Sequence, residues 1–144
     1  AYGGAFGKVK KTKVVALNPD EVFEMIIRIV GARKDTKTII FDDDNFTISS
    51  DRLSRLWKMI IDAKKEGRIS PDVSFICQAR IDNFRSAPAR DSMPLIREAG
   101  FRMIMYGVES FSENVLAEFG KNTDIALIDD VLKATRNAGI NPLI

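Results

Sequence analysis

The sequence predicts an α/β fold made of consecutive parallel βα units. Short β-branched or aromatic runs begin near residues 38, 73, 101 and 140, a spacing of roughly 30 to 40 residues that suits a strand and its crossover helix. Segments with helical periodicity separate these runs, and a crossover helix makes its two flanking strands parallel. Periodicity alone leaves open whether the units form a portion of a (β/α) barrel or an open doubly wound sheet, because both contain the same right-handed unit.

The first predicted helix begins after Asn18. Asn18 is a capping residue, Pro19 suits the first helical position, and two acids follow in the first turn. The apolar residues that follow share one helical face, namely Val22, Ile26, Ile29 and Val30. We therefore expect an amphipathic helix that lies on a sheet and ends near Gly31.

The remaining elements follow in alternation. A buried strand is predicted over 38–41, and a second helix from about Ser50 ends before Gly67. The later elements are a strand over 73–79, a short helix over 92–99, a strand over 101–108, a helix over 124–138 and a strand that starts near Ile140.

Composition limits the chemistry. The 144 residues carry a net charge of +2 with no clustered basic patch, so no nucleic-acid partner is expected. No apolar run has the roughly 20 residues of a membrane span, and we expect a soluble, cytoplasmic chain. One cysteine and no histidine exclude a CxxC site and imidazole ligands. Carboxylates, Lys, Arg or a cofactor must therefore carry any reaction.

Polar side chains follow three of the predicted strands. "DDDN" begins at Asp42, "QARID" contains Arg80, and "GVES" ends in Glu109 and Ser110. The carboxyl ends of parallel strands share one edge of the sheet, where ligands bind in α/β proteins. The sequence therefore predicts a binding site at this edge.

Each candidate has a structural alternative. The acids at 42–44 suit a cation, a phosphoryl group or an ammonium group, or they form a polar turn. Arg80 suits a carboxylate or phosphate, or forms a salt bridge with Asp82 or with an acid of the same edge. Glu109 suits two vicinal hydroxyls such as those of a ribose, or it is a helix-start acid with Ser110 or Ser112 as the cap.

The order of motifs resembles the middle of a radical S-adenosylmethionine (SAM) domain. The matching segments are "NPDEVFEMI", "TIIFDDDNFT", "FICQARID", "GFRMIMYGVESFSENVLAEFGKNT" and "VLKATRNAGI". The resemblance covers residues 18–144 and is closest to the branch with cobalamin-binding members, methylthiotransferase-like enzymes and anaerobic Mg-protoporphyrin monomethyl ester oxidative cyclases. It implies a portion of a partial (β/α)6 TIM-like barrel.

The resemblance also implies cofactors and roles for residues. In this family a [4Fe-4S] cluster on a CxxxCxxC loop reductively cleaves SAM to a 5′-deoxyadenosyl radical, with electrons from a donor such as flavodoxin or ferredoxin, for chemistry on a small-molecule substrate. By the same resemblance, Asp42 or Asp43 receives the methionine amino group, and Glu109, beside Ser110, binds the ribose. Arg80 is a candidate for the methionine carboxylate or the substrate, and the parent protein is a candidate for cobalamin binding.

The chain departs from the family pattern because it contains no CxxxCxxC motif. The family places this loop just before the segment that resembles "GKVKKTKVVALNPDEV". We therefore expect residues 1–144 to be a fragment that lacks the cluster loop and the last strands, is inactive alone and tends to dimerise. Two alternatives are a receiver-like regulatory module with a cation or phospho-acceptor site at Asp42–Asp44, and a metal-dependent barrel hydrolase that uses only carboxylates.

Overall fold

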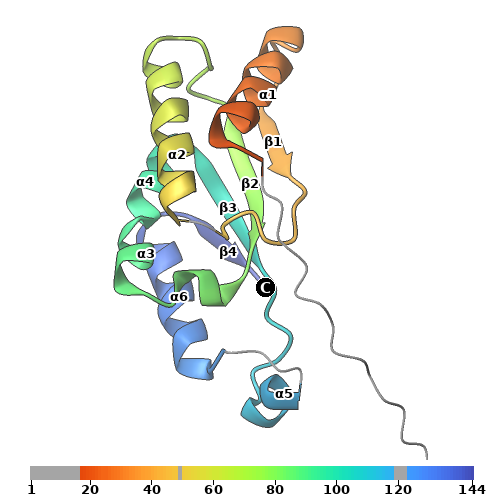
Figure 1. The fold of residues 1–144 in the computed structure, drawn as a ribbon, viewed down its shortest axis with the longest axis vertical. Helices are drawn as coiled ribbons and strands as arrows, with labels where there is room; N and C mark the ends of the chain where they lie inside the picture. Colours follow the sequence, from red (N-terminus) through yellow and green to blue (C-terminus); the bar gives the residue numbers. More distant parts are fainter. Residues whose placement is uncertain (1–16, 49, 119–122) are drawn as a thin grey trace, which may run out of the picture.

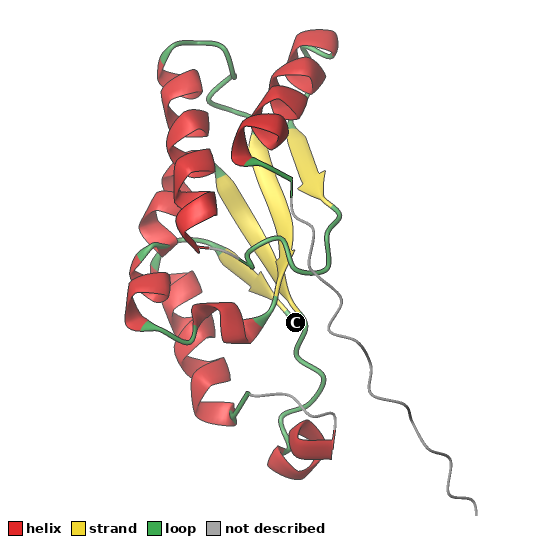
Figure 2. Cartoon of the chain, in the orientation of Figure 1, coloured by secondary structure: helices red, strands yellow, loops and turns green. Residues whose placement is uncertain are grey.

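The computed structural model describes residues 17–48, 50–118 and 123–144. Its strands are β1 (Thr38–Phe41), β2 (Ser74–Ala79), β3 (Phe101–Tyr106) and β4 (Asn141–Leu143). Its helices are α1 (Pro19–Ala32), α2 (Ser50–Lys65), the 3₁₀ helix η1 (Ile81–Phe84), α3 (Ala87–Asp91), α4 (Met93–Ala99), α5 (Glu113–Glu118) and α6 (Ile125–Asn137). Helices and strands alternate along the chain, as Figures 1 and 2 show. The α/β prediction is confirmed.

The order of the strands distinguishes between the two predicted architectures. All four strands are parallel and pair in the order β1-β2-β3-β4, without the reversal of a doubly wound sheet. Right-handed crossovers in an unreversed order place the helices on one face of the sheet, and α1 packs on α2, which packs on α4. This arrangement is that of a portion of a (β/α) barrel.

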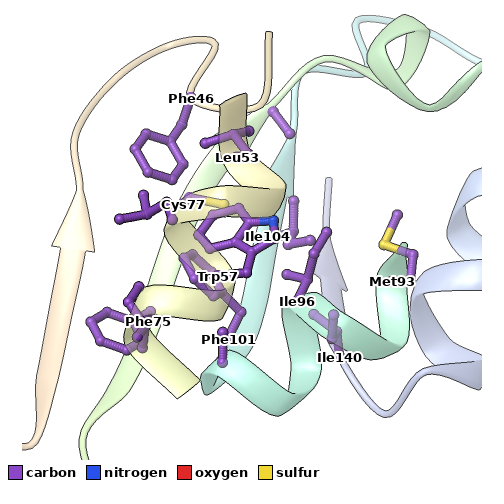
Figure 3. Packing of buried hydrophobic residues seen from close by; sticks show 14 of the residues in the cluster. Phe46, Leu53, Trp57, Phe75, Cys77, Met93, Ile96, Phe101, Ile104 and Ile140 are labelled. Atoms are coloured by element: carbon purple, nitrogen blue, oxygen red, sulfur yellow. The ribbon is translucent and has the colours of Figure 1, made fainter. Parts of the chain in front are cut away.

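Because the helices cover one face of the sheet, successive side chains of β2 alternate between buried and half-buried positions. Phe75, Cys77 and Ala79 are buried toward the helices, whereas Ile76 and Gln78 are only half-buried. Figure 3 shows the buried side, where Phe75 and Cys77 lie close to Trp57 of α2. The helix-covered face is therefore the main core of the described structure.

Helix α1 begins as predicted but has a shifted apolar face. The Asn18 side chain accepts a hydrogen bond from the Asp20 N–H, and the Glu21 carboxylate accepts one from the Asn18 N–H, so the cap is reciprocal. Phe23 is buried, whereas Ile29 is 40% exposed. The prediction for Ile29 was wrong because the buried stripe is centred on Val22, Phe23 and Ile26, which puts Ile29 at its margin.

The connection between β2 and β3 contains two elements that the periodicity did not predict. Residues 81–91 form η1 and α3, and Ser86 caps α3 by accepting a hydrogen bond from the Ala89 N–H. Helices this short repeat no apolar face, so they leave no periodic signal. The strand predicted over 101–108 ends at Tyr106, because the chain turns where the Val108 N–H donates to the Tyr106 carbonyl.

A buried polar pair joins β3 to α6. The Tyr106 hydroxyl lies 2.8 Å from the Thr135 hydroxyl, which donates to the Val131 carbonyl at 2.7 Å. Thr135→Val should leave the Tyr106 hydroxyl buried without its partner and lower the free energy of unfolding by about 1–3 kcal/mol. The double variant Tyr106→Phe/Thr135→Val should recover most of this loss in urea unfolding. A double variant as unstable as Thr135→Val would contradict this account.

Cys77 lies on the buried face of β2 and should be inert in the folded chain. Burial raises the pKa of its thiol from 9.0 to about 12, so the folded state disfavours the thiolate. Its contribution to stability is complete below about pH 9 and is lost as the pH rises toward about 12. The difference in unfolding free energy between the natural chain and Cys77→Ala should therefore shrink over this interval. At pH 8 a thiol reagent should label Cys77 only after urea is added.

Candidate functional site

The polar residues predicted from the sequence converge at the carboxyl edge of the sheet. Phe41 pairs with Cys77, so Asp42 lies beside Gln78, whose side-chain amide is 3.4 Å from an Asp42 carboxylate oxygen. Farther along the edge, the Gly107 N–H donates to the Ala79 carbonyl at 3.2 Å. Because neighbouring strands lie about 4.8 Å apart, the loops that follow β1, β2 and β3 start side by side.

The loop after β1 exposes its acids. Asp42, Asp43 and Asp44 are exposed, and an Asp43 carboxylate oxygen accepts the Asn45 N–H at 2.9 Å. This bond forms the polar turn that was one of the predicted alternatives. In the described ranges, no group of three or more Asp, Glu, Cys or His side chains is placed to hold a metal ion.

Arg80 forms the ion pair that the sequence analysis left open. Its guanidinium donates from Nε to Asp82 Oδ1 at 2.9 Å and from Nη2 to Oδ2 at 2.8 Å. These hydrogen bonds lower the pKa of Asp82, which keeps the carboxylate ionised. A ligand carboxylate that binds the Nε–Nη2 edge of Arg80 must displace Asp82, whereas one that binds through Nη1 need not.

Glu109 and Ser110 lie in the loop between β3 and α5. Glu109 is exposed, while Ser110 is half-buried and accepts the Ser112 N–H at 3.0 Å with its hydroxyl. The Ser112 carbonyl accepts the Leu116 N–H and so opens α5. Both residues thus stand on the same edge as Asp42, and Ser110 also shapes the turn that leads to α5.

Three polar side chains connect the loops after β1 and β2, of which Asn45 belongs to the predicted "DDDN" motif, whereas the sequence analysis missed Thr47 and Asn83. The Asn83 side-chain amide donates to Asn45 Oδ1 at 2.5 Å and to Thr47 Oγ1 at 2.8 Å. The sequence pointed to these residues through their position alone, since Asn45 and Asn83 each follow a predicted strand within five residues. The sequence could not show that these segments touch.

An apolar groove of about 360 Å³ runs between α1 and β1 and reaches Asp42 and Asp43. Its lining includes four exposed large hydrophobic residues, namely Leu17, Met25, Ile29 and Ile40. The groove thus places an uncovered apolar surface next to the acidic end of the site.

The fold and this edge define the chain as a portion of a parallel (β/α) barrel with a polar carboxyl rim. Its structural neighbours include the cobalamin-dependent SAM radical enzyme OxsB, with a TM-score of 0.73 and 19% identity over 88% of this chain. They also include the radical SAM methyltransferase TsrM from Kitasatospora setae, with a TM-score of 0.68 and 13% identity over 86% of this chain. At these identities the likeness shows the fold.

The chain spans only a small part of these enzymes, 19% of OxsB and 24% of TsrM. Two of the OxsB structures contain aqua-cobalamin, one of them together with SAM, and the TsrM structure contains cobalamin and a [4Fe-4S] cluster. No protein-family model matches the sequence, and a search of curated proteins finds no match. Among the described helices, none is long and apolar enough to cross a bilayer.

Proposed function

We propose that this chain is part of a radical SAM enzyme and that its carboxyl rim binds SAM. The observation that carries the proposal is the fold likeness to SAM-bound OxsB, which extends over 88% of the chain. The sequence motifs support it independently, because the residues that resemble the SAM-binding segments of the family lie on the ligand-binding edge of the sheet. Both neighbours bind cobalamin, which favours the cobalamin-binding branch of the family. The closer resemblance to the cyclases of that branch stays a prediction.

The rim offers groups of suitable chemistry for SAM. The exposed carboxylates of Asp42 and Asp43 suit the methionine ammonium, and Glu109 beside Ser110 suits the two ribose hydroxyls. Arg80 suits the methionine carboxylate through the guanidinium donors that the Asp82 pair does not use.

The cluster needs ligands from outside these residues. Cys77 is fully buried and its raised pKa disfavours the thiolate that iron requires, so a CxxxCxxC loop elsewhere in the parent protein must hold the cluster. When bound, the cluster would supply the electron that cleaves SAM, drawn from a flavodoxin or ferredoxin, for chemistry on a small-molecule substrate. Residues 1–144 alone should accordingly bind SAM without cleaving it.

The proposal is tested by an NMR titration of the 144-residue chain with SAM. We expect saturable shifts of backbone amides at the ends of β1, β2 and β3, and no 5′-deoxyadenosine after addition of a reductant. Shifts confined to the amino edge of the sheet, or none at millimolar SAM, would reject the SAM site. Sequencing of the gene upstream of Ala1 tests whether the parent protein is a radical SAM enzyme, because such an enzyme must encode a CxxxCxxC loop.

We further propose that the isolated chain self-associates through the edge of β1. This strand lies at one edge of the described sheet, and Ile40 is 60% exposed beside the apolar groove. Two copies related by a two-fold axis can pair their β1 edges and cover both grooves. Ile40→Lys should lower the mass measured by light scattering toward that of a monomer, whereas Ile125→Lys on α6 should not. A natural chain that is monomeric at all concentrations would contradict this proposal.

A further inference from the structure

The side-chain amide of Asn83 links two loops of the rim across the sheet edge. Asn83 lies in η1, directly after β2, and its two hydrogen-bond acceptors, Asn45 and Thr47, lie 38 and 36 residues earlier in the loop after β1. Thr47 is only 6% exposed, and Asn45 and Asn83 are half-buried. Because water reaches this region poorly, these bonds are costly to lose.

The same linkage continues to the acids of the rim. The Asn45 backbone N–H donates to an Asp43 carboxylate oxygen at 2.9 Å, while the Asn45 side chain accepts from Asn83. Asn83 therefore restrains the residue that in turn orients the Asp43 carboxylate. Without this restraint, the exposed loop would sample many arrangements because ordering it costs conformational entropy, and repulsion among its three adjacent acids would disfavour arrangements that bring them together.

We propose that Asn83 is a positioning residue for ligand binding at the carboxyl rim. It acts through Asn45 and holds the loop after β1 so that Asp42 and Asp43 are ordered before the ligand arrives. This inference rests on the proposed SAM site, because it assigns Asn83 a part in binding the same ligand. A loop ordered in advance raises affinity by reducing the entropy lost on binding.

The test is a comparison of SAM affinities in the 144-residue chain by NMR titration. Asn83→Ala removes both donated hydrogen bonds and should weaken SAM binding about tenfold, the equivalent of one or two net hydrogen bonds. Asn83→Asp should retain nearly the natural affinity, because the Asn45 amide can turn over and the Thr47 hydroxyl can donate to the new carboxylate. The matched control is Asn141→Ala, an exposed asparagine of β4.

A double-mutant cycle distinguishes positioning from a general loss of stability. Asn45→Ala should weaken binding as much as Asn83→Ala, and the double variant should be no weaker than either, since all three break one linkage. Equal SAM affinity of Asn83→Ala and the natural chain would overturn the inference, whatever the change in melting temperature. If Asn83→Ala does not fold, an unchanged affinity of Asn45→Ala would overturn it instead. An absence of SAM binding by the natural chain would reject the proposed function first, and this inference with it.

Discussion

Replacement of Phe101 by alanine is expected to lower the free energy of unfolding by about 3–5 kcal/mol, the range for a large aromatic side chain removed from a core. Phe101 is fully buried at the start of β3. Its ring centroid lies 4.5 Å from that of Trp57 on α2 and 5.3 Å from that of Phe75 on β2. Figure 3 shows these rings filling the space between the sheet and α2.

The cavity left by this substitution cannot close easily. Phe101 also stacks with Phe41 at 5.8 Å and with Phe46 at 6.4 Å, so one ring contacts two strands, a loop and a helix. Each of these neighbours is fixed by other contacts, and a site that cannot collapse has the larger cost. Because a domain of this size is stable by only about 5–15 kcal/mol, the variant should lose a large part of its stability and unfold at a much lower urea concentration.

Urea unfolding followed by far-ultraviolet circular dichroism measures this effect. Phe111→Ala is the matched control, because Phe111 is 55% exposed and its loss should change the free energy by less than about 0.5 kcal/mol. A loss below about 1 kcal/mol for Phe101→Ala would mean that the aromatic cluster is not the centre of the core.

Replacement of Glu109 by alanine is expected to weaken SAM binding by tenfold or more. In the proposed site this carboxylate accepts hydrogen bonds from two ribose hydroxyls, and hydrogen bonds to a charged group contribute about 1.5–3 kcal/mol each. Glu109 is exposed on the loop after β3, so its removal should leave the free energy of unfolding within about 0.5 kcal/mol of the natural value.

The control for Glu109→Ala is Glu66→Gln. Glu66 is an exposed acid that pairs with Arg68 in the turn before β2, at the opposite edge of the sheet. Both variants remove one negative charge, so a general electrostatic effect on a cationic sulfonium ligand would appear in both. If the two variants bind SAM with equal affinity, the proposed role of Glu109 in binding the ribose is contradicted. A loss confined to Glu109→Ala would support that role.

The sequence by itself determined the four strands, the longer helices and the edge that carries the polar residues. The Asn18 cap, the helical face that contains Leu56 and Trp57, and the strand that contains Phe75 are each encoded by residues close together in the chain. Local patterns suffice here because capping and apolar periodicity depend on neighbours a few residues apart. The ends of β1 and β2 followed from these patterns, and parallel strands then brought Asp42 and Glu109 to the same edge.

The tertiary structure alone decided which architecture forms and which polar groups meet. The unreversed order of β1 to β4 depends on pairing between segments some 30 residues apart, and helical periodicity is the same in either architecture. Asn83 contacts Asn45 across 38 residues of chain, and Ile29 is exposed because the packing of α1 selects one of two adjacent apolar stripes. A local pattern states which face of an element is apolar, but only the register and the packing of distant elements decide what that face meets.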